Sequence, residues 1–323
     1  MSDNSHQELL AQVATMYYEQ ELTQHAIAAK LGLSRVKIYR LLKQARVEQV
    51  VQIIINWPTQ RDAELEKRLQ QAFGLKEALV LKTSPQNGMS TLQRLGQLSA
   101  RYLERTLTDG STMAVCLGRT SYETIHAISP SFQAEVRVAQ AVGSMPFAMQ
   151  ELDSATLARE LAHNLGGEVF YLNSPLMGDT VEAGHVIRNQ RDVKHTLDVA
   201  KSADVALTGI GNLDPTISGF SLAGFINADD LAALVVAGAV GDMAGQIYTL
   251  DGTLYPCEYN QRVIGITLEE LKQIPTVMAV AMGQKKARAI LGGLRTGAIN
   301  VLCTDDQAAN EVLKLNGDLR EIV

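Results

Sequence analysis

The sequence has few cysteines and no long apolar run. Its three cysteines, Cys116, Cys257 and Cys303, are odd in number, lie far apart and never form a CxxC pair. They therefore predict neither a disulfide framework nor a zinc site, and they fit a reducing cytoplasm. No uninterrupted apolar stretch approaches the roughly 18 residues of a membrane span, and the first residues are polar. We expect a cytoplasmic protein that is neither secreted nor inserted in a membrane.

One segment lacks acidic side chains. Between Leu22 and Val47 the chain has six basic residues and no carboxylate, although the whole protein carries a formal net charge of −6. Because this segment contributes +6, the rest of the chain must sum to −12. A length of 323 residues exceeds one average domain. We therefore predict a small basic module, residues 1–56, followed by a larger acidic domain, residues 57–323.

The basic segment has the pattern of two short helices joined by a tight turn. Thr23 is placed to cap a helix that Gly32 ends, and Ser34 is placed to cap a second helix. Apolar residues of the second helix recur at i, i+3, i+4 and i+7, and the basic residues fall largely on other faces. These apolar residues are Ile38, Leu41, Leu42 and Ala45. With an earlier helix from about 8 to 18, the pattern predicts a helix-turn-helix unit whose second helix enters the major groove of DNA.

The second helix, from Ser34 to about Val47, holds most of the candidate DNA contacts. We expect base-edge or nearby phosphate contacts from Arg35, Lys37 and Tyr39, and phosphate contacts from Arg40 and Lys43. The full candidate set is Thr23, Gln24, Ser34, Arg35, Lys37, Tyr39, Arg40 and Lys43. The alternative is an amphipathic helix pair with a solvated basic face. Binding through phosphates would weaken steeply with salt.

From residue 77 onward, apolar strand-like segments alternate with helical stretches. The predicted strands are 78–81, 112–116, 136–142, 205–207, 277–281 and 299–302. This alternation predicts an α/β domain with a mainly parallel, buried sheet. Before it, a β-branched strand at 50–56 and a helix at 62–73 form a connector. The apolar face of that helix could pack on its own domain or on a partner subunit.

Two glycine-containing loops after predicted strands are candidate ligand sites, because ligands of parallel sheets collect at the carboxyl ends of the strands. The segment 118–121 combines backbone amides, hydroxyls and a helix N-terminus, which suits an anion such as phosphate, although Thr120 or Ser121 could be an ordinary helix cap. The segment from Gly209 to Gly211 would let the backbone approach a ligand closely, or would serve as a plain turn.

Two further loops carry charged side chains. Asp242 follows Gly238 and Gly241 in an apolar stretch, where it could accept hydrogen bonds from sugar hydroxyls or cap a turn. Lys286 follows Gly283 at the start of a predicted helix, where a positive charge opposes the helix dipole. A bound anion would relieve that opposition. The alternative is a long side chain that reaches solvent.

Taken together, these residues resemble the SorC family of bacterial sugar-responsive transcriptional regulators. The resemblance covers nearly the whole chain, and its specificity comes from both modules standing in the right order. It rests on Tyr17, Tyr18, Leu22, Thr23, Gln24, Ile27, Ala28, Leu31, Gly32, Ser34, Arg40, Leu41, Leu42, Gly118, Arg119, Thr120, Gly209, Ile210, Gly211, Gly241, Asp242 and Lys286. It implies an effector domain that resembles glucosamine-6-phosphate deaminases and ribose-phosphate isomerases in fold but binds a sugar or sugar phosphate.

The resemblance also implies roles for single residues. Gly118, Arg119 and Thr120 match the family's phosphate-binding loop, and Asp242 and Lys286 match positions that hold effector hydroxyls and phosphate. In place of the family's frequent glycine and tryptophan before this loop, the chain has Cys116 and Leu117, which would change the wall of the site. The candidate effector-binding residues are Gly118, Arg119, Thr120, Ser121, Gly209, Gly211, Asp242 and Lys286.

We therefore expect a DNA-binding regulator of a carbohydrate or polyol operon, controlled by a sugar or sugar phosphate. Its partners would be double-stranded operator DNA, the effector and further copies of the chain in a dimer or tetramer, with no catalytic residue, metal or cofactor. The alternative is a sugar-phosphate isomerase or deaminase with a DNA-binding appendage. Its base would come from Asp242, Asp305, His126, His163 or His185, no pair of which has motif-like spacing. A pure assembly protein using the 62–73 helix would explain neither the basic segment nor the glycine loops.

Overall fold

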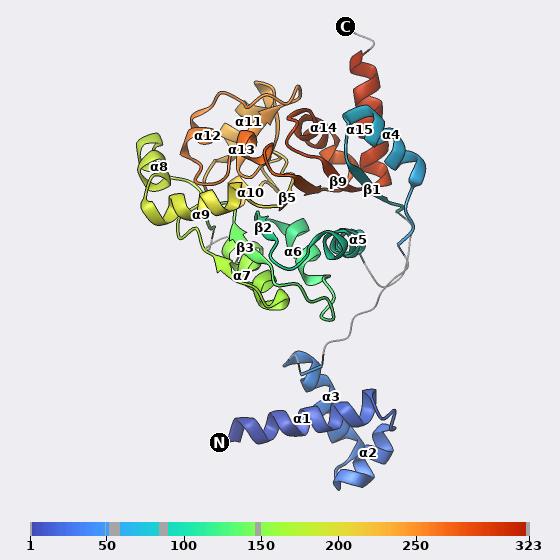
Figure 1. Ribbon diagram of the computed structural model, residues 1–323. Helices are drawn as coiled ribbons and strands as arrows, with labels where there is room; N and C mark the ends of the chain where they lie inside the picture. Colours follow the sequence, from blue (N-terminus) through green and yellow to red (C-terminus); the bar gives the residue numbers. More distant parts are fainter. Residues whose placement is uncertain (1, 49, 52–58, 84–89, 146–149, 321–323) are drawn as a thin grey trace. The chain divides into compact units, whose positions relative to one another are not determined.

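The chain divides into two compact units, Met1–Trp57 and Pro58–Val323, in the computed structural model shown in Figure 1. The structure describes residues 2–48, 50–51, 59–83, 90–145 and 150–320. The predicted boundary between residues 56 and 57, and most of the predicted strand at 50–56, lie outside the described residues. None of the described helices is both long and apolar enough to span a bilayer.

The first unit is helical. It contains α1 (Ser2–Tyr18), α2 (Gln24–Leu31) and α3 (Arg35–Val47). The hydroxyl of Thr23 accepts the Ala26 N–H at 3.2 Å, and that of Ser34 accepts the Lys37 N–H at 3.2 Å. Both predicted N-caps are confirmed, and Gly32 ends α2 with a left-handed φ of 64°. The helices enclose a core of their own, made of Leu10, Val13, Ala14, Ile27, Ala28, Ile38, Leu41, Leu42 and Ala45.

The second unit is built on a parallel sheet, as predicted. Its described strands follow the order β1-β9-β8-β5-β2-β3-β4, and every neighbouring pair is parallel. Their bounds are β1 Glu77–Leu81, β2 Thr112–Val115, β3 Arg137–Gln140, β4 Val169–Phe170, β5 Val205–Gly209, β8 Thr276–Val280 and β9 Val301–Asp305. The predicted strand at 136–142 is longer than β3, and the one predicted at 299–302 begins before β9. In both places buried apolar residues continue beyond the strand.

Helices cover both faces of this sheet. Along β1, Leu79 and Leu81 face a core that includes residues of α5, α6 and α7, whereas Ala78 and Val80 face a core that includes residues of α4, α14 and α15. Figure 1 shows these helices in two layers. The helices and 3₁₀ turns are α4 Ala63–Phe73, α5 Thr91–Thr106, α6 Arg119–His126, η1 Gln150–Leu152, α7 Ser154–Leu165, α8 Val181–Arg188, α9 Arg191–Lys201, α10 Gly219–Leu222, α11 Ala228–Val236, α12 Glu258–Arg262, α13 Leu268–Leu271, η2 Gln284–Lys286, α14 Ala287–Arg295 and α15 Asp306–Arg320.

The connector helix α4 packs on its own unit. Leu65 and Leu69 are buried in the same core as α14 and α15, and Phe73 packs against it. Asp62 caps the helix by accepting the Leu65 N–H at 3.2 Å. Of the two possibilities for its apolar face, the structure shows packing within the chain.

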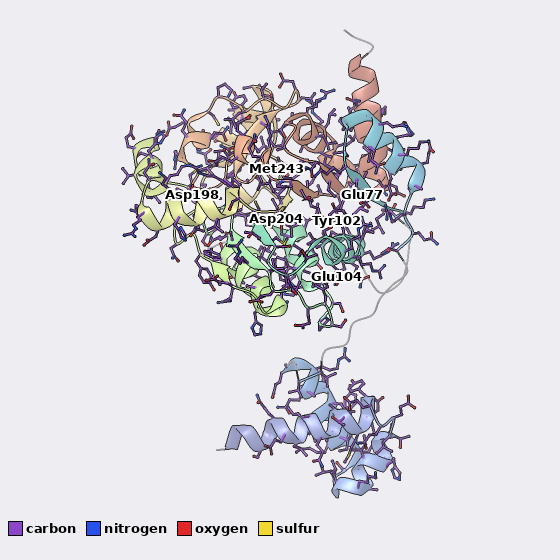
Figure 2. The ribbon with its side chains drawn as sticks, viewed as in Figure 1. Glu77, Tyr102, Glu104, Asp198, Asp204 and Met243 are labelled. Carbon is purple, nitrogen blue, oxygen red and sulfur yellow. The ribbon has the colours of Figure 1, made fainter. Side chains whose placement is uncertain are left out.

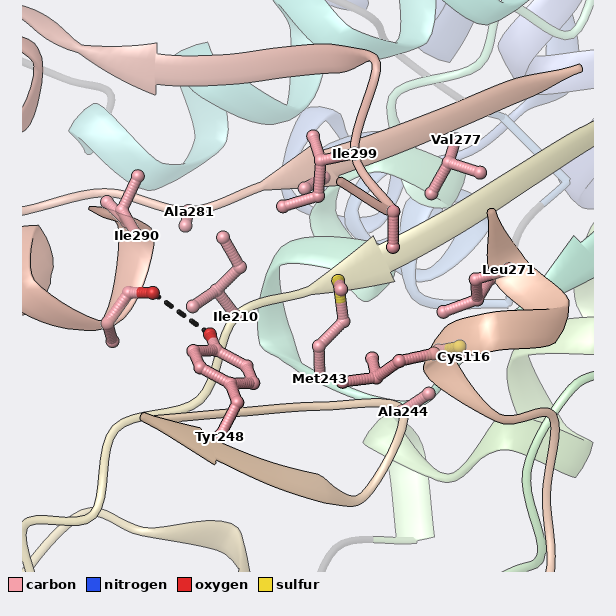
Figure 3. Close-up of a cluster of buried hydrophobic side chains, with 14 of the residues drawn as sticks. Cys116, Ile210, Met243, Ala244, Tyr248, Leu271, Val277, Ala281, Ile290 and Ile299 are labelled. Atoms are coloured by element: carbon pink, nitrogen blue, oxygen red, sulfur yellow. Dashed lines mark hydrogen bonds between the residues drawn. The ribbon is translucent and has the colours of Figure 1, made fainter. Parts of the chain in front are cut away.

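A small antiparallel hairpin lies beside the main sheet, where the sequence had suggested a loop. It consists of β6 (Ala239–Met243) and β7 (Gln246–Thr249). The prediction of a loop at 238–242 is wrong, and Asp242 is a strand residue rather than a turn or cap. Two glycines suggested a loop, but burial alternates along β6: Ala239, Gly241 and Met243 are buried and the residues between them are partly exposed. Figures 2 and 3 label Met243, which anchors this hairpin in the core.

Candidate functional site

The first candidate site is the exposed face of α3. Arg35, Lys37, Arg40, Lys43 and Arg46 are exposed, whereas the predicted apolar stripe of the same helix is buried. Among the described residues, none of these five basic side chains forms an ion pair within 4 Å. The face therefore presents positive charge that no carboxylate of the described chain compensates within 4 Å.

The other candidate DNA contacts also lie on this unit. Tyr39 is 57% exposed on α3, and Gln24 is partly exposed at the start of α2. Thr23 and Ser34 are exposed, but their hydroxyl oxygens accept backbone N–H groups as helix caps. Each hydroxyl keeps one O–H that can still donate to a phosphate.

The second candidate site forms where segments far apart in the sequence meet at the carboxyl end of β5. Gly211 and Asp242 form an antiparallel bridge, in which the Gly211 N–H donates to the Asp242 carbonyl at 2.9 Å and the reverse bond measures 3.2 Å. Lys286 reaches the same strand end, because its Nζ donates to the Ile210 carbonyl at 2.6 Å. The structure thus brings together three of the four predicted loops: 209–211, the segment with Asp242, and the turn with Lys286.

Gly211 leaves room for the Asp242 side chain where it now lies. A Cβ built on Gly211 would lie 1.9 Å from Oδ1 of Asp242. The absence of a side chain at residue 211 therefore lets the carboxylate lie against the backbone. Gly209 is less constrained, since a Cβ there would meet only the Thr120 hydroxyl, at 3.1 Å. That contact also places Thr120, and with it the fourth loop, beside the end of β5.

The segment 118–121 is the start of a helix more than a loop. Gly118 has a φ of 127° and precedes α6, whose first turn consists of Arg119, Thr120 and Ser121. No side chain caps this helix, so its N-terminus offers backbone amides and the positive end of the dipole. Ser121 is 0% exposed, and its hydroxyl has no hydrogen-bond partner among the described residues.

Burial shifts the titration of the charged groups in this site. Desolvation raises the pKa of Asp242 to about 6, even though the nearby charge of Lys286 favours the carboxylate. Burial lowers the pKa of Lys286; Asp242 opposes that shift, and the positive charge of Arg119 adds to it. The charge of each group affects the pKa of the other, but the two side chains form no ion pair within 4 Å. The partly buried Asp242 and Lys286, together with the exposed Arg119, suit a ligand with hydroxyl groups and a negative charge.

Sequence reasoning missed one residue that builds the site, Tyr248 on β7. Its side chain is 0% exposed, and its hydroxyl donates to the Ala289 carbonyl of α14 at 3.0 Å. Figure 3 shows this bond within the buried cluster that includes Ile210 and Met243. Burial and the charge of Asp242 raise the pKa of Tyr248. This hydrogen bond joins the β6–β7 hairpin, which carries Asp242, to α14, which follows Lys286. A buried tyrosine in an apolar run was the available signal, because its hydroxyl needs a partner.

Of the residues nominated as catalytic bases, Asp242 lies at this site, but the other four do not gather around it. The Asp305 carboxylate accepts the N–H groups of Gly283, at 2.6 Å, and Ala308, at 2.8 Å, so it shapes the turn before Lys286. His126 is exposed and stacks on Tyr122, with ring centroids 3.9 Å apart. His163 and His185 are exposed on α7 and α8.

Comparisons with known proteins match the chain over almost its whole length. Residues 58–314 match the family model of a sugar-binding domain. The transcriptional regulator LsrR of Klebsiella pneumoniae subsp. pneumoniae is 33% identical over 315 residues, which cover 96% of this chain and 94% of that protein. The sorbitol operon regulator of Klebsiella pneumoniae is 30% identical over 312 residues, 95% of this chain and 98% of that protein. The crystal structure of full-length SorC from Klebsiella pneumoniae superposes with a TM-score of 0.71 at 29% identity and covers 95% of this chain and 99% of that one.

Proposed function

This chain belongs to the SorC family of transcriptional regulators, and from that premise we propose that α3 binds operator DNA and that a sugar or sugar phosphate binds at the end of β5 to control it. The chain is a transcriptional regulator of the kind that controls sugar or polyol operons, and its relatives are regulators rather than enzymes. The alternative of a sugar-phosphate isomerase or deaminase is therefore set aside.

The observation that carries the effector site is the meeting of Asp242 and Lys286 at Gly211 and Ile210. The residues come from a hairpin, a 3₁₀ turn and a central strand, and 44 positions separate the two charged residues in the sequence. Burial disfavours the charged forms of both Asp242 and Lys286, and the Asp242 carboxylate gains no ion pair within 4 Å to offset that cost. A sugar would supply hydroxyl donors to Asp242.

A phosphate group on the effector would bind to the positively charged groups of the site. Arg119, Lys286 and the uncapped N-terminus of α6 supply positive charge. These groups favour a phosphorylated sugar over the free sugar.

Control of DNA binding would come from a shift between two arrangements of a symmetric oligomer. Paired α3 helices can read two half-sites only at a fixed spacing, about 34 Å or a multiple of it. An effector that binds one arrangement more tightly changes the population able to bind DNA, and DNA changes effector affinity by the same factor. The oligomer would be a dimer or tetramer in the cytoplasm.

The test is binding of the purified full-length chain to DNA from its own upstream region, with a panel of sugars and their phosphates. We expect Lys286→Ala to bind DNA like the wild type and to lose the response to a phosphorylated sugar. Lys285→Ala is the matched control, because Lys285 is the adjacent lysine and is exposed. Equal losses of affinity for the phosphorylated and the free sugar in Lys286→Ala would refute the phosphate contact.

A further inference from the structure

Two apolar side chains in the first two turns of α3 are exposed on its basic face. Val36 is 60% exposed and Tyr39 is 57% exposed, whereas the other apolar residues in the first three turns of α3 are at most 5% exposed. A spacing of three residues makes Val36 and Tyr39 neighbours on the helix surface. Arg40 and Lys43 continue the same face at i+4 and i+7 from Val36, and Arg35 flanks it.

The position of Val36 is not explained by the stability of the first unit. Valine has a lower helix propensity than lysine, glutamate or alanine, and an exposed valine gains little from burial. Val36 packs into neither the core of the unit nor its partly buried margin. Its surroundings carry positive charge without a carboxylate from Leu22 to Val47, so the partner of this face is a polyanion.

On the edge of a DNA duplex, one apolar group faces the major groove, namely the C5-methyl group of thymine. The N-terminal residues of a recognition helix are those that reach base edges. Val36 is the second residue of α3, and the Ser34 cap fixes the start of that helix. A methyl-bearing side chain therefore stands where a base edge would be read, between cations that would contact the DNA backbone on either side.

We propose that Val36, flanked by Tyr39, packs on the C5-methyl group of one thymine in each operator half-site and makes this chain select T·A at that position. The inference rests on the proposed function, since it names the base that the DNA-binding face recognises. It concerns specificity, whereas Arg40 and Lys43 would supply affinity that is independent of sequence.

The experiment replaces one thymine of the operator at a time by uracil, which removes the methyl group and leaves base pairing unchanged. The operator is first located by footprinting the wild-type protein on DNA from its own upstream region. At one thymine per half-site we expect uracil to weaken wild-type binding about fourfold, which corresponds to ~0.8 kcal/mol for one buried methyl group. Val36→Ala should reduce that uracil penalty to less than about twofold, and Val36→Ile should restore it.

Val47→Ala is the matched control. Val47 is 74% exposed and lies on the same face of α3, because eleven residues are close to three full turns. It stands about 16 Å farther along the helix axis, at the end away from the base edges. We expect its uracil penalty to equal that of the wild type.

The outcomes separate the inference from the proposed function. Specific binding that is indifferent to uracil at every thymine, or a uracil penalty that Val36→Ala leaves unchanged, would overturn the inference and leave the regulator intact. Failure of the wild type to select any DNA sequence would overturn both. Substitutions at positions 36 and 47 lie on the exposed surface, so the first unit should fold in each variant, as checked by its helical circular dichroism.

Discussion

Replacing Asp242 by asparagine should make the effector-free protein more stable and unable to respond to its effector. The structure motivates this because burial holds the pKa of Asp242 at about 6, against an ordinary value of 3.8. A raised carboxylate pKa means that the native state binds a proton that the unfolded state releases. The charge therefore lowers the free energy of unfolding. This loss grows as pH rises from about 4 to about 6 and stays constant above that range.

The size of the effect follows from the same pKa. The interval between 3.8 and about 6 corresponds to about 3 kcal/mol at pH 7. This figure is an upper limit, because the side chain is only partly buried and water screens part of the cost. Asparagine has the shape of the protonated acid, so Asp242→Asn should recover up to that amount at pH 7 and much less at pH 4.5.

The assay is urea unfolding of the wild type and the variant, without effector, at the two pH values. Asp251→Asn is the control, because hydrogen bonds from Thr249 and Thr253 lower the pKa of that aspartate and its charge favours the native state. We expect no gain of stability from it. Effector titrations on the same samples should show that Asp242→Asn has lost the response. An Asp242→Asn protein less stable than the wild type at pH 7 would refute the reasoning and make the carboxylate a structural group.

Three further outcomes follow from the contacts. Gly211→Ala should abolish the effector response, because the new Cβ would displace the Asp242 carboxylate, whereas Gly209→Ala should weaken it by no more than a few fold, as titration of both variants would show. Ser34→Ala should destabilise the first unit by about 1 kcal/mol through loss of the N-cap, measured by thermal melting of that unit's helices. Tyr248→Phe should lower the free energy of unfolding by about 1 kcal/mol and weaken effector binding while leaving DNA affinity unchanged, a result that unfolding and titration together would check.

The two helices of the helix-turn-helix could be predicted almost residue by residue, because their signals are local, whereas the helix before them begins at Ser2 and not near residue 8 as predicted. Thr23, Gly32 and Ser34 determine the ends of two helices, and one apolar stripe determines which face is buried. The α/β class followed from apolar segments that alternate with helices, although strand ends were less accurate. An apolar run such as 136–142 indicates which residues are buried, but not where the strand ends. Buried residues continue on both sides of β3.

The effector site was predicted in its parts but not in its assembly. Which loops meet depends on the order of strands in the sheet, and β5 stands between β8 and β2, so that Gly211, Asp242 and Lys286 converge. The hairpin of β6 and β7 was missed because Gly238 and Gly241 resemble loop residues. Gly241 is instead needed for packing, since a Cβ there would lie 2.6 Å from the Cβ of Ala289. The pKa of Asp242 is raised because the tertiary structure buries this side chain, and no local sequence pattern predicts that burial.

The measurement that tests the central claim most directly is the affinity of the full-length chain for its upstream DNA at two salt concentrations, with and without sugar phosphates. We expect specific binding that weakens steeply with salt, with a slope of about −4 in log affinity against log salt if Arg40 and Lys43 of two subunits contact phosphates. One sugar phosphate should change that affinity, and the change should vanish in Asp242→Asn. Binding that is absent, or that is equal for every DNA sequence and every sugar, would contradict the account.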